Sequence, residues 1–265
     1  MNCGIKNRKA FVTGGATGIG KAIAIALAKE GASIVVTSRD QKRIDQTLSE
    51  LKNASDTKHF GIVCDLNSEN EPKSAFKKIS NDFGEIDILV NNIGSNLGIT
   101  DPYCSIDDWR KVFRINFELA VELNNLFIPN MKKKNWGRIL NITSLAGLEN
   151  SGPVTYCVAK AALTAYTRTM GRILATESEN VVMTALMPGV VVTEEGYWRD
   201  VLEKNPDHAE RYLKERCPLG RLGKTNEISP MAVLMCSDHA SFMHGAIVPV
   251  DAGQSKHFMY FNYLD

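Results

Sequence analysis

Tyr156 and Lys160 stand four residues apart in a segment with helical periodicity, so their side chains share one face, about one turn apart. A tyrosine is a general acid or base near neutral pH only if its pKa falls from about 10 toward 7, a change worth about 4 kcal/mol. One ammonium about 4 Å away, at an effective dielectric constant near 20, supplies about that much. The pair therefore predicts proton transfer by Tyr156, with Lys160 lowering the pKa of the phenol.

A second chemical pattern is the glycine-rich run Thr-Gly-Gly-Ala-Thr-Gly-Ile-Gly at positions 13–20, between a predicted strand and a predicted helix. Gly14 permits a tight turn, Gly18 lets the backbone approach a pyrophosphate, and Gly20 allows close packing of helix against strand. The helix N-terminus then offers unpaired N–H groups and a partial positive charge to phosphates. The run predicts a dinucleotide site, to which Ala16, Thr17 and Ile19 also belong.

The elements that must position these residues alternate between short apolar strands and longer amphipathic helices. Near-continuous apolar strands separated by helices indicate a parallel sheet covered on both faces. We predict an α/β fold, with a single doubly wound Rossmann-type domain over residues 1–265 and about seven strands. The predicted strands are 10–12, 33–37, 61–64, 86–90, 138–142, 181–186 and 246–250; the predicted helices are 20–30, 41–51, one through 76–79, 107–131, 156–176 and 227–237.

The composition sets limits on function. The chain has 265 residues, 44% of them hydrophobic, and a formal charge of +1, which gives no reason to expect nucleic acid or a membrane surface as partner. The six cysteines contain no C-x-x-C pair, and the five histidines show no metal-binding spacing, so we expect reduced thiols and no metal site. With neither a signal peptide nor an apolar run long enough to span a membrane, we expect a cytoplasmic protein.

Taken in order along nearly the whole chain, the motifs resemble those of the short-chain dehydrogenase/reductase family, and in particular its 3-oxoacyl-[acyl-carrier-protein] reductases. The glycine run has the spacing T-G-x-x-x-G-x-G, and residues 91–94 (Asn-Asn-Ile-Gly) are similar to the family's N-N-A-G. An asparagine in the long helix and a serine after the fifth strand precede Y-x-x-x-K and P-G-x-x-x-T. These family positions are Asn116, Ser144, Tyr156, Lys160 and residues 188–193, and segments 218–223 and 250–253 also match.

The resemblance implies an oxidoreductase that transfers a hydride between nicotinamide and a carbonyl or secondary alcohol. In reduction, Tyr156 would donate a proton to the carbonyl oxygen while Ser144 hydrogen-bonds that oxygen. Lys160 would also hold the nicotinamide ribose, and Asn116 would organise a water chain that resupplies the proton. The remaining cofactor contacts implied by the motifs are Asn92, Gly94, Pro188, Gly189, Val191 and Thr193.

The end of the second strand bears on the choice of dinucleotide. An NAD enzyme places a carboxylate there for the ribose hydroxyls, whereas an NADP enzyme places an arginine for the 2′-phosphate. The family's acidic position is Ser38 here, and Arg39 follows it, so we predict NADP(H). Asp40 keeps NAD(H) open as an alternative, since it could serve as the ribose acid if the strand ended later. By resemblance, Asp65 and Leu66 contact the adenine.

Three positions depart from the commonest family pattern. Ile93 replaces a small alanine beside the cofactor and could narrow the site, and Thr184 stands where many relatives have asparagine. Glu118 follows Asn116 by two residues, and we expect it to face solvent or an interface.

Substrate identity depends on a charged insertion at about 193–217 and on the tail at about 254–265. The insertion mixes aromatic and basic residues, which fits a lid over an anionic or polar substrate and also fits an ordinary solvated helical lid. The apolar tail predicts packing across a subunit interface, with a homotetramer or homodimer expected.

Two classes of function remain open. The first is a reductase of a small-molecule carbonyl, free or carrier-linked, with a 3-oxoacyl thioester as the first expectation and a sugar or other polar ketone as the second. The other class is a dinucleotide-sensing protein without turnover, which the presence of Asn116, Ser144, Tyr156 and Lys160 disfavours. An enoyl reductase of the same fold is also disfavoured, because its tyrosine and lysine are spaced more widely.

Overall fold

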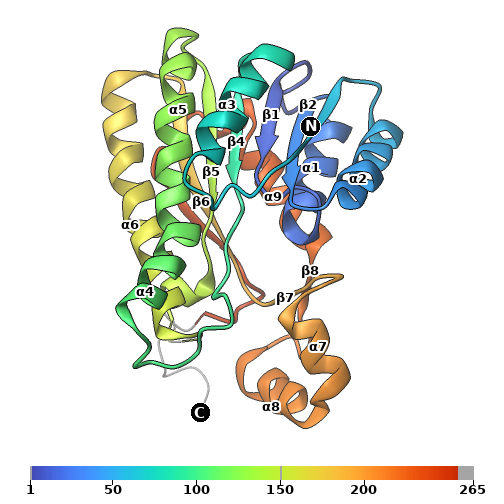
Figure 1. Ribbon diagram of the computed structural model, residues 1–265, viewed down its shortest axis with the longest axis vertical. Coiled ribbons are helices and arrows are strands. Elements are labelled where there is room, and N and C mark those ends of the chain that lie inside the picture. Colours follow the sequence, from blue (N-terminus) through green and yellow to red (C-terminus); the bar gives the residue numbers. More distant parts are fainter. Residues whose placement is uncertain (1, 150, 256–265) are drawn as a thin grey trace.

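The computed structural model describes residues 2–149 and 151–255, and it contains one seven-stranded parallel sheet (Figure 1). The strand order is β3-β2-β1-β4-β5-β6-β9, so the chain runs outward from β1 to one edge and then returns to build the other half. The predicted doubly wound α/β fold is confirmed. The strands are β1 (Lys9–Val12), β2 (Ser33–Ser38), β3 (His59–Val63), β4 (Ile88–Asn91), β5 (Gly137–Ile142), β6 (Val181–Pro188) and β9 (Ile247–Val250).

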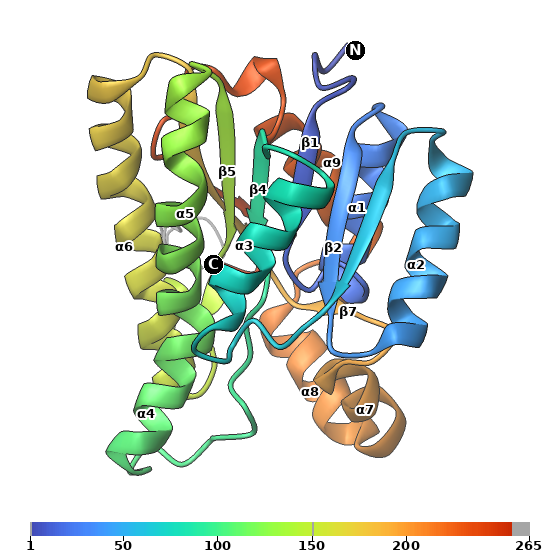
Figure 2. The ribbon, with the colours of Figure 1, turned by 45° about the horizontal axis from the view of Figure 1, so that its top comes forward.

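Helices cover both faces of this sheet (Figure 2). Side chains alternate along each strand, so Phe11 packs against Phe127 on one face while Ala10 and Val12 join the core on the other. One face carries α1 (Gly18–Lys29), α2 (Gln41–Ala54) and α9 (Thr225–Met235); the other carries α3 (Glu71–Asp82), α4 (Ile106–Phe113), α5 (Leu119–Lys133) and α6 (Val154–Glu177).

The predicted helix over 107–131 differs from the structure in one respect. A π-helical turn, η1 (Arg114–Glu118), separates α4 from α5. The side-chain amide of Asn116 donates to the carbonyl of Val112, four residues earlier, at 2.8 Å. A side chain that takes this carbonyl competes with the α-helical backbone bond, which accounts for the wider turn.

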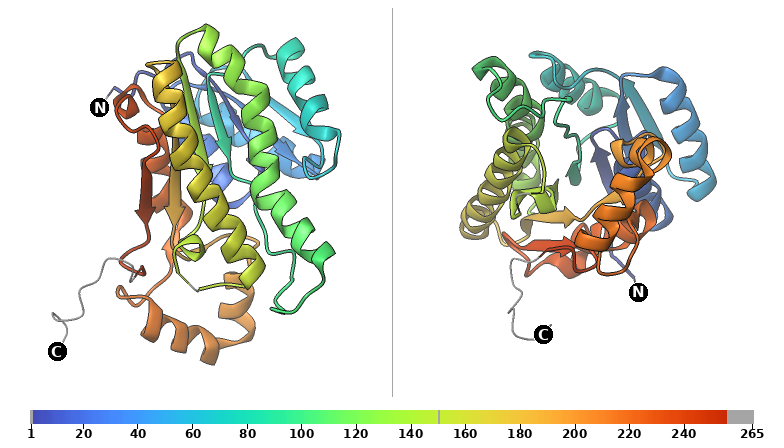
Figure 3. Two further views of the ribbon diagram at one scale, coloured as in Figure 1. Left: turned by 90° about the vertical axis from the view of Figure 1, so that its left-hand side faces the viewer. Right: turned by 90° about the horizontal axis from the view of Figure 1, so that it is seen from below.

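The insertion at 193–217, which we call the lid segment, contains α7 (Tyr197–Lys204) and α8 (Pro206–Arg216). Figure 1 and Figure 3 show both helices projecting beyond the carboxyl end of the sheet. A small parallel ribbon, β7 (Val191–Val192) and β8 (Gly223–Lys224), joins the two ends of the insertion to the body of the domain. The position of the lid segment at this edge fits the predicted binding loop.

The remaining expectations concern single positions and the tail. Glu118 is exposed, as predicted, whereas Thr184 is buried. None of the described helices has the length and apolar character needed to cross a membrane. The tail expected at an interface lies, from residue 256 onward, outside the described residues.

The helix that carries Tyr156 and Lys160 touches the loop before β9 through two glycines. A Cβ on Gly171 would lie 2.2 Å from the backbone nitrogen of Gly245. Helix propensity favours alanine over glycine by about 1 kcal/mol, but the backbone contact must shift. We therefore expect Gly171→Ala to lower the free energy of unfolding by about 1–3 kcal/mol in urea titrations.

Gly152→Ala is the control, because its Cβ would find no heavy atom closer than 3.6 Å. A change within about 0.5 kcal/mol is expected there. A Gly171→Ala protein as stable as the wild type would contradict the contact.

Candidate active site

The glycine run forms a turn between β1 and α1 with two residues in the left-handed region, Gly14 at φ +59° and Gly18 at φ +55°. The backbone N–H of Gly14 donates to Thr37 Oγ1 at 3.1 Å, which fixes the turn against β2. Gly20 packs as predicted: a Cβ there would lie 2.5 Å from Asn92 Nδ2. The helix N-terminus at Gly18, with no side-chain hydrogen bond from Thr17, keeps its N–H groups available to a phosphate.

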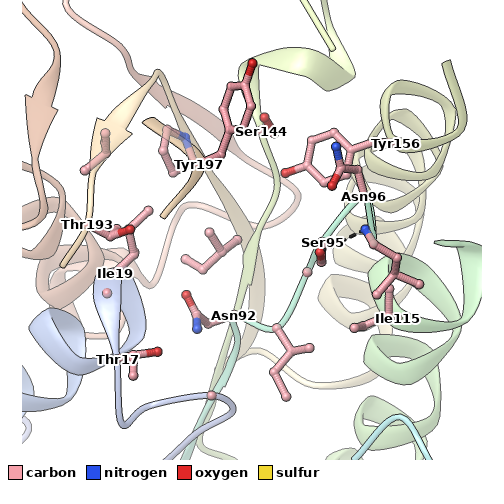
Figure 4. Close-up of a pocket in the computed structure, with 18 of the residues that line it drawn as sticks. Thr17, Ile19, Asn92, Ser95, Asn96, Ile115, Ser144, Tyr156, Thr193 and Tyr197 are labelled. Atoms are coloured by element: carbon pink, nitrogen blue, oxygen red, sulfur yellow. Dashed lines mark hydrogen bonds between the residues drawn. The ribbon is translucent and has the colours of Figure 1, made fainter. Parts of the chain in front are cut away.

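A cavity of about 1180 Å³ extends from this turn to Tyr156. It exceeds the usual range for one small ligand, so it can hold a dinucleotide and a second molecule. Figure 4 shows the Tyr156 ring entering it from the side opposite Thr17, Ile19 and Thr193. Of the predicted site residues, those that line the cavity are Gly14, Ala16, Thr17, Gly18, Ile19, Ser38, Arg39, Asp65, Leu66, Asn92, Gly94, Ser144, Tyr156, Lys160, Pro188, Gly189, Val191 and Thr193; Gly20 and Asn116 stand behind its wall.

Ser144 and Tyr156 meet at the far end of this cavity. Ser144 follows β5 and accepts a hydrogen bond from the N–H of Ala146 at 3.1 Å, which starts a short 3-10 turn over Leu145–Gly147. Tyr156 lies in the first turn of α6. A hydrogen bond between the two side chains lowers the pKa of Tyr156, while burial of the phenol raises it by more.

Lys160 lies one turn further along α6 with only 2% of its surface exposed. Its Nζ donates to the carbonyl oxygen of Ile142 at 2.9 Å and stands 5.7 Å from the centre of the Tyr156 ring. A Cβ at Gly94 would come within 2.7 Å of this nitrogen, so a larger residue there would force the amino group to shift. Burial lowers the pKa of Lys160 to about 8.

These values correct the predicted electrostatics of the pair. The net effect of the protein groups is to raise the pKa of Tyr156, and the lysine is not among the causes that lower it. The physical reason is desolvation, which disfavours the phenolate of Tyr156 and the ammonium of Lys160 alike. The predicted placement of the two side chains on one helical face nevertheless agrees with the structure.

Asn116 is held in the π turn and is 1% exposed. Its Nδ2 donates to the carbonyl of Ser95 at 2.6 Å, and its Oδ1 accepts from the N–H of Ser95 at 3.1 Å. Because Ser95 lines the cavity, Asn116 fixes the backbone of the cavity wall beside Gly94. The described protein contacts show a positioning role for this residue, and the water chain stays a prediction.

The opposite end of the cavity lies at the carboxyl end of β2. Arg39 is exposed and makes no ion pair within the described part of the chain. Arg43, in the first turn of α2, lines the same space, and sequence reasoning did not single it out. Asp40 is engaged locally: it caps α2 by accepting from the N–H of Lys42 at 2.8 Å and lies 3.6 Å from Arg43.

The lid segment contributes an aromatic wall. Trp198 stacks on His208 with ring centres 6.0 Å apart and an interplanar angle of 9°. Its ring centre also lies 4.2 Å from that of Tyr212. All three line the cavity together with Tyr197. The arginines and the lysine among the aromatic and basic residues considered for an anionic substrate lie elsewhere: Arg199, Arg211, Lys214 and Arg216 are exposed and do not line the cavity.

Two residues outside the cavity lining hold the loops that form it, through contacts that the sequence did not predict. Thr13 accepts at Oγ1 from the N–H groups of Asn92 and Ile93, at 2.9 and 3.2 Å, and so joins the ends of β1 and β4. Gln254 accepts from the N–H of Val190 at 2.8 Å and holds the loop after β6. Such contacts join distant segments, and local spacing carries no trace of them.

Comparison with known proteins gives consistent relatives. A family model described as enoyl-(acyl carrier protein) reductase matches residues 14–255. The 3-oxoacyl-[acyl-carrier-protein] reductase of Aquifex aeolicus is 32% identical over 254 residues, covering 96% of this chain and 99% of that protein.

Two solved structures are similar over nearly the full length. L-sorbose reductase from Gluconobacter frateurii, in complex with NADPH and L-sorbose, has a TM-score of 0.89 and 26% identity and covers 97% of this chain and 99% of its own. A 7α-hydroxysteroid dehydrogenase, in complex with NADH and 7-oxo-glycochenodeoxycholic acid, has a TM-score of 0.85 and 29% identity. The match covers 95% of this chain and 96% of the dehydrogenase chain.

The buried lysine yields a prediction about stability and pH. Its folded-state pKa of about 8 lies below the ordinary 10.5, so below pH 8 folding must bury a charge. The shift costs about 3 kcal/mol, and the hydrogen bond to Ile142 returns about 1 kcal/mol. We expect Lys160→Met to be about 2 kcal/mol more stable than the wild type at pH 7.

The stability advantage of Lys160→Met should shrink as the pH rises from about 8 toward 10.5, because Lys160 of the wild type is then deprotonated in the folded protein. Urea unfolding of both proteins at pH 7 and pH 9.5 measures this difference. A Lys160→Met protein less stable than the wild type at pH 7 would show that the buried charge does not lower the free energy of unfolding.

Proposed function

Because the chain belongs to the short-chain dehydrogenase/reductase family of oxidoreductases, we propose that it transfers a hydride between NADP(H) and a carbonyl or secondary alcohol, with Tyr156 as the general acid/base. One observation carries the proposal. The glycine turn at the head of α1 and the group formed by Ser144, Tyr156 and Lys160 line opposite ends of a single cavity. A cofactor that binds its pyrophosphate at the turn can therefore reach the proton donor.

The residues at both ends fit a nicotinamide dinucleotide. The glycines of the turn have no Cβ to crowd a phosphate or a neighbouring residue. A Cβ added at Gly18 would lie 3.2 Å from Thr193 Cγ2, which is already a close contact. Arg39 and Arg43 line the cavity at the end of β2, where Ser38 replaces a carboxylate. Two cations there favour a 2′-phosphate, and the capping bond of Asp40 to α2 argues against its service as a ribose acid. NADPH in the sorbose reductase supports this choice, whereas NADH in the steroid dehydrogenase marks the alternative.

The chain's own residues would act on the substrate oxygen. When bound, the reduced nicotinamide supplies the hydride. Ser144 donates a hydrogen bond to the carbonyl oxygen, and Tyr156 gives up its proton to the same oxygen as negative charge develops there. Lys160, with a pKa of about 8, can hold or release a proton near neutral pH, one turn from Tyr156. Asn116 keeps the wall at Ser95 in place.

For the substrate, we place a 3-oxoacyl thioester first. The support is the Aquifex reductase, which matches almost from end to end. The family model carries an enoyl reductase description, but Tyr156 and Lys160 stand four residues apart, and the family resemblance implies a wider spacing for an enoyl reductase of this fold. Carbonyl reduction therefore fits this chain better than reduction of a carbon–carbon double bond.

A sugar or other polar ketone is the second candidate. The lid segment places aromatic rings and the His208 imidazole over the substrate end, beside the polar wall residues Ser95 and Asn96. Flat aromatic faces with nearby hydrogen-bonding groups suit a polyol as well as an acyl chain. The L-sorbose complex of the similar reductase supports this alternative.

The role of Tyr156 has a direct test. We expect Tyr156→Phe to keep less than about a tenth of wild-type turnover, since a general acid contributes about 10²–10⁴-fold. NADPH affinity should remain within about threefold, because the ring is kept. Oxidation of NADPH with a 3-oxoacyl thioester and with a ketose measures turnover, and tryptophan fluorescence measures binding. Turnover above a tenth would remove Tyr156 from the role.

The cofactor preference depends on Arg39. NADPH should bind at least about tenfold tighter than NADH, which is about 1.4 kcal/mol, and Arg39→Ala should lose most of that preference. Tryptophan fluorescence quenching in paired titrations gives the four dissociation constants. If NADH binds the wild type as tightly as NADPH does, the proposed preference for NADP(H) is wrong.

A further inference from the structure

Ion pairs tie the start of the lid segment to the helices beside the glycine turn. Lys21 of α1 lies 3.5 Å from Glu194 and 3.2 Å from Glu50. Next to it, Arg43 of α2 pairs through Nη2 with the carboxylate of Glu195. Tyr197, the first residue of α7, follows two positions after Glu195. The anchor of the lid segment therefore lies at the adenosine end of the cavity, away from Tyr156.

Arg43 is placed to meet the cofactor. It lines the cavity together with Arg39, Ala16 and Thr17. One turn further along α2, Thr47 Oγ1 donates to the carbonyl of Ala16 at 3.3 Å, so this face of the helix packs on the glycine turn. A group bound between that turn and Arg39 would be within the reach of the Arg43 guanidinium.

We propose that Arg43 is a second ligand of the cofactor's 2′-phosphate, and that Glu195 competes with that phosphate for Arg43. The inference rests on the proposed NADP(H) preference and adds to it a coupling between binding of the 2′-phosphate and the position of the lid segment. Binding of a 2′-phosphate would take Arg43 from Glu195 and release the lid segment at its anchor. A cofactor without the phosphate would leave the pair intact.

The energetics favour the exchange. Arg43 and Glu195 are 42% and 60% exposed, and ion pairs with such exposure are weak and easily replaced. A phosphate carries more charge than a carboxylate and accepts two parallel hydrogen bonds from a guanidinium. A second carboxylate near Arg43 is that of Asp40, at 3.6 Å, which remains bound to the helix N-terminus and can stay in place.

The test compares 2′,5′-ADP with 5′-AMP, which differ only in the 2′-phosphate and lack nicotinamide. Calorimetry would give both affinities for the wild type and for Glu195→Gln, Arg43→Gln and the double variant. Glu194→Gln is the matched control, because it removes the adjacent carboxylate, which pairs with Lys21 rather than Arg43.

We expect Glu195→Gln to bind 2′,5′-ADP about threefold tighter than the wild type, with 5′-AMP unchanged. Arg43→Gln should bind 2′,5′-ADP about tenfold more weakly, and Glu195→Gln should have no further effect in that background. Glu194→Gln should keep the wild-type ratio of the two affinities. Hydrogen exchange of residues 197–216 should rise when 2′,5′-ADP is added to the wild type, and should be high from the start in Glu195→Gln.

The failures are distinguishable. A wild type that binds both probes equally refutes the cofactor preference, and with it this inference. A wild type that discriminates, with Glu195→Gln behaving like Glu194→Gln, refutes the competition alone. Discrimination that survives Arg43→Gln undiminished removes Arg43 from the phosphate site.

Discussion

Lys160 holds an amino group where almost no water reaches it, and much of the site is arranged around that buried group. The Ile142 carbonyl accepts its hydrogen bond, and Gly94 leaves the space that a side chain would take from it. Asn116 borders the same space and fixes the adjoining wall through Ser95, at the expense of regular helix geometry in η1. Burial lowers the pKa of the lysine to about 8, so the group can change protonation in the range where an enzyme works. Sites of this kind give up folding stability to keep a reactive arrangement.

The parallel sheet brings the two ends of the cavity together. Every loop that carries a proposed site residue leaves the carboxyl end of a strand, which is the edge where ligands bind in open α/β sheets. The same edge anchors the lid segment, through Thr193 at the glycine turn and Glu195 at α2. Cofactor binding and the position of the aromatic wall can therefore influence each other without a contact between cofactor and lid helices.

The sequence predicted the doubly wound fold class and a set of site residues, most of which line the cavity, because these depend on local spacing and apolar runs. Gly14, Gly18 and Tyr156 belong to patterns whose physical reason is contained within a few residues. The pKa of Tyr156 could not be predicted from the sequence in the same way. Sequence spacing brought Lys160 near Tyr156 and predicted a lowered phenol pKa, but the degree of burial decides the sign, and burial is a property of the whole fold.

Contacts between distant segments were also beyond local patterns. Neither the pairing of Arg43 with Glu195 nor the π turn at Asn116 follows from hydrophobic periodicity. In the lid segment, the aromatic and basic residues could both have faced the substrate. Packing turned Trp198, His208 and Tyr212 inward and left Arg211 and Lys214 outside, and this outcome depends on how α7 and α8 meet.

Hydride transfer to a substrate bound in this cavity can be tested directly. The most direct measurement is mass spectrometry of the alcohols formed from a 3-oxoacyl thioester and from a ketose when the wild type is incubated with NADPH in which deuterium replaces both hydrogens of the reactive carbon. We expect one deuterium on the former carbonyl carbon of at least one product. Tight NADPH binding with no deuterium in either product would contradict it and favour a protein that senses the dinucleotide without turning it over.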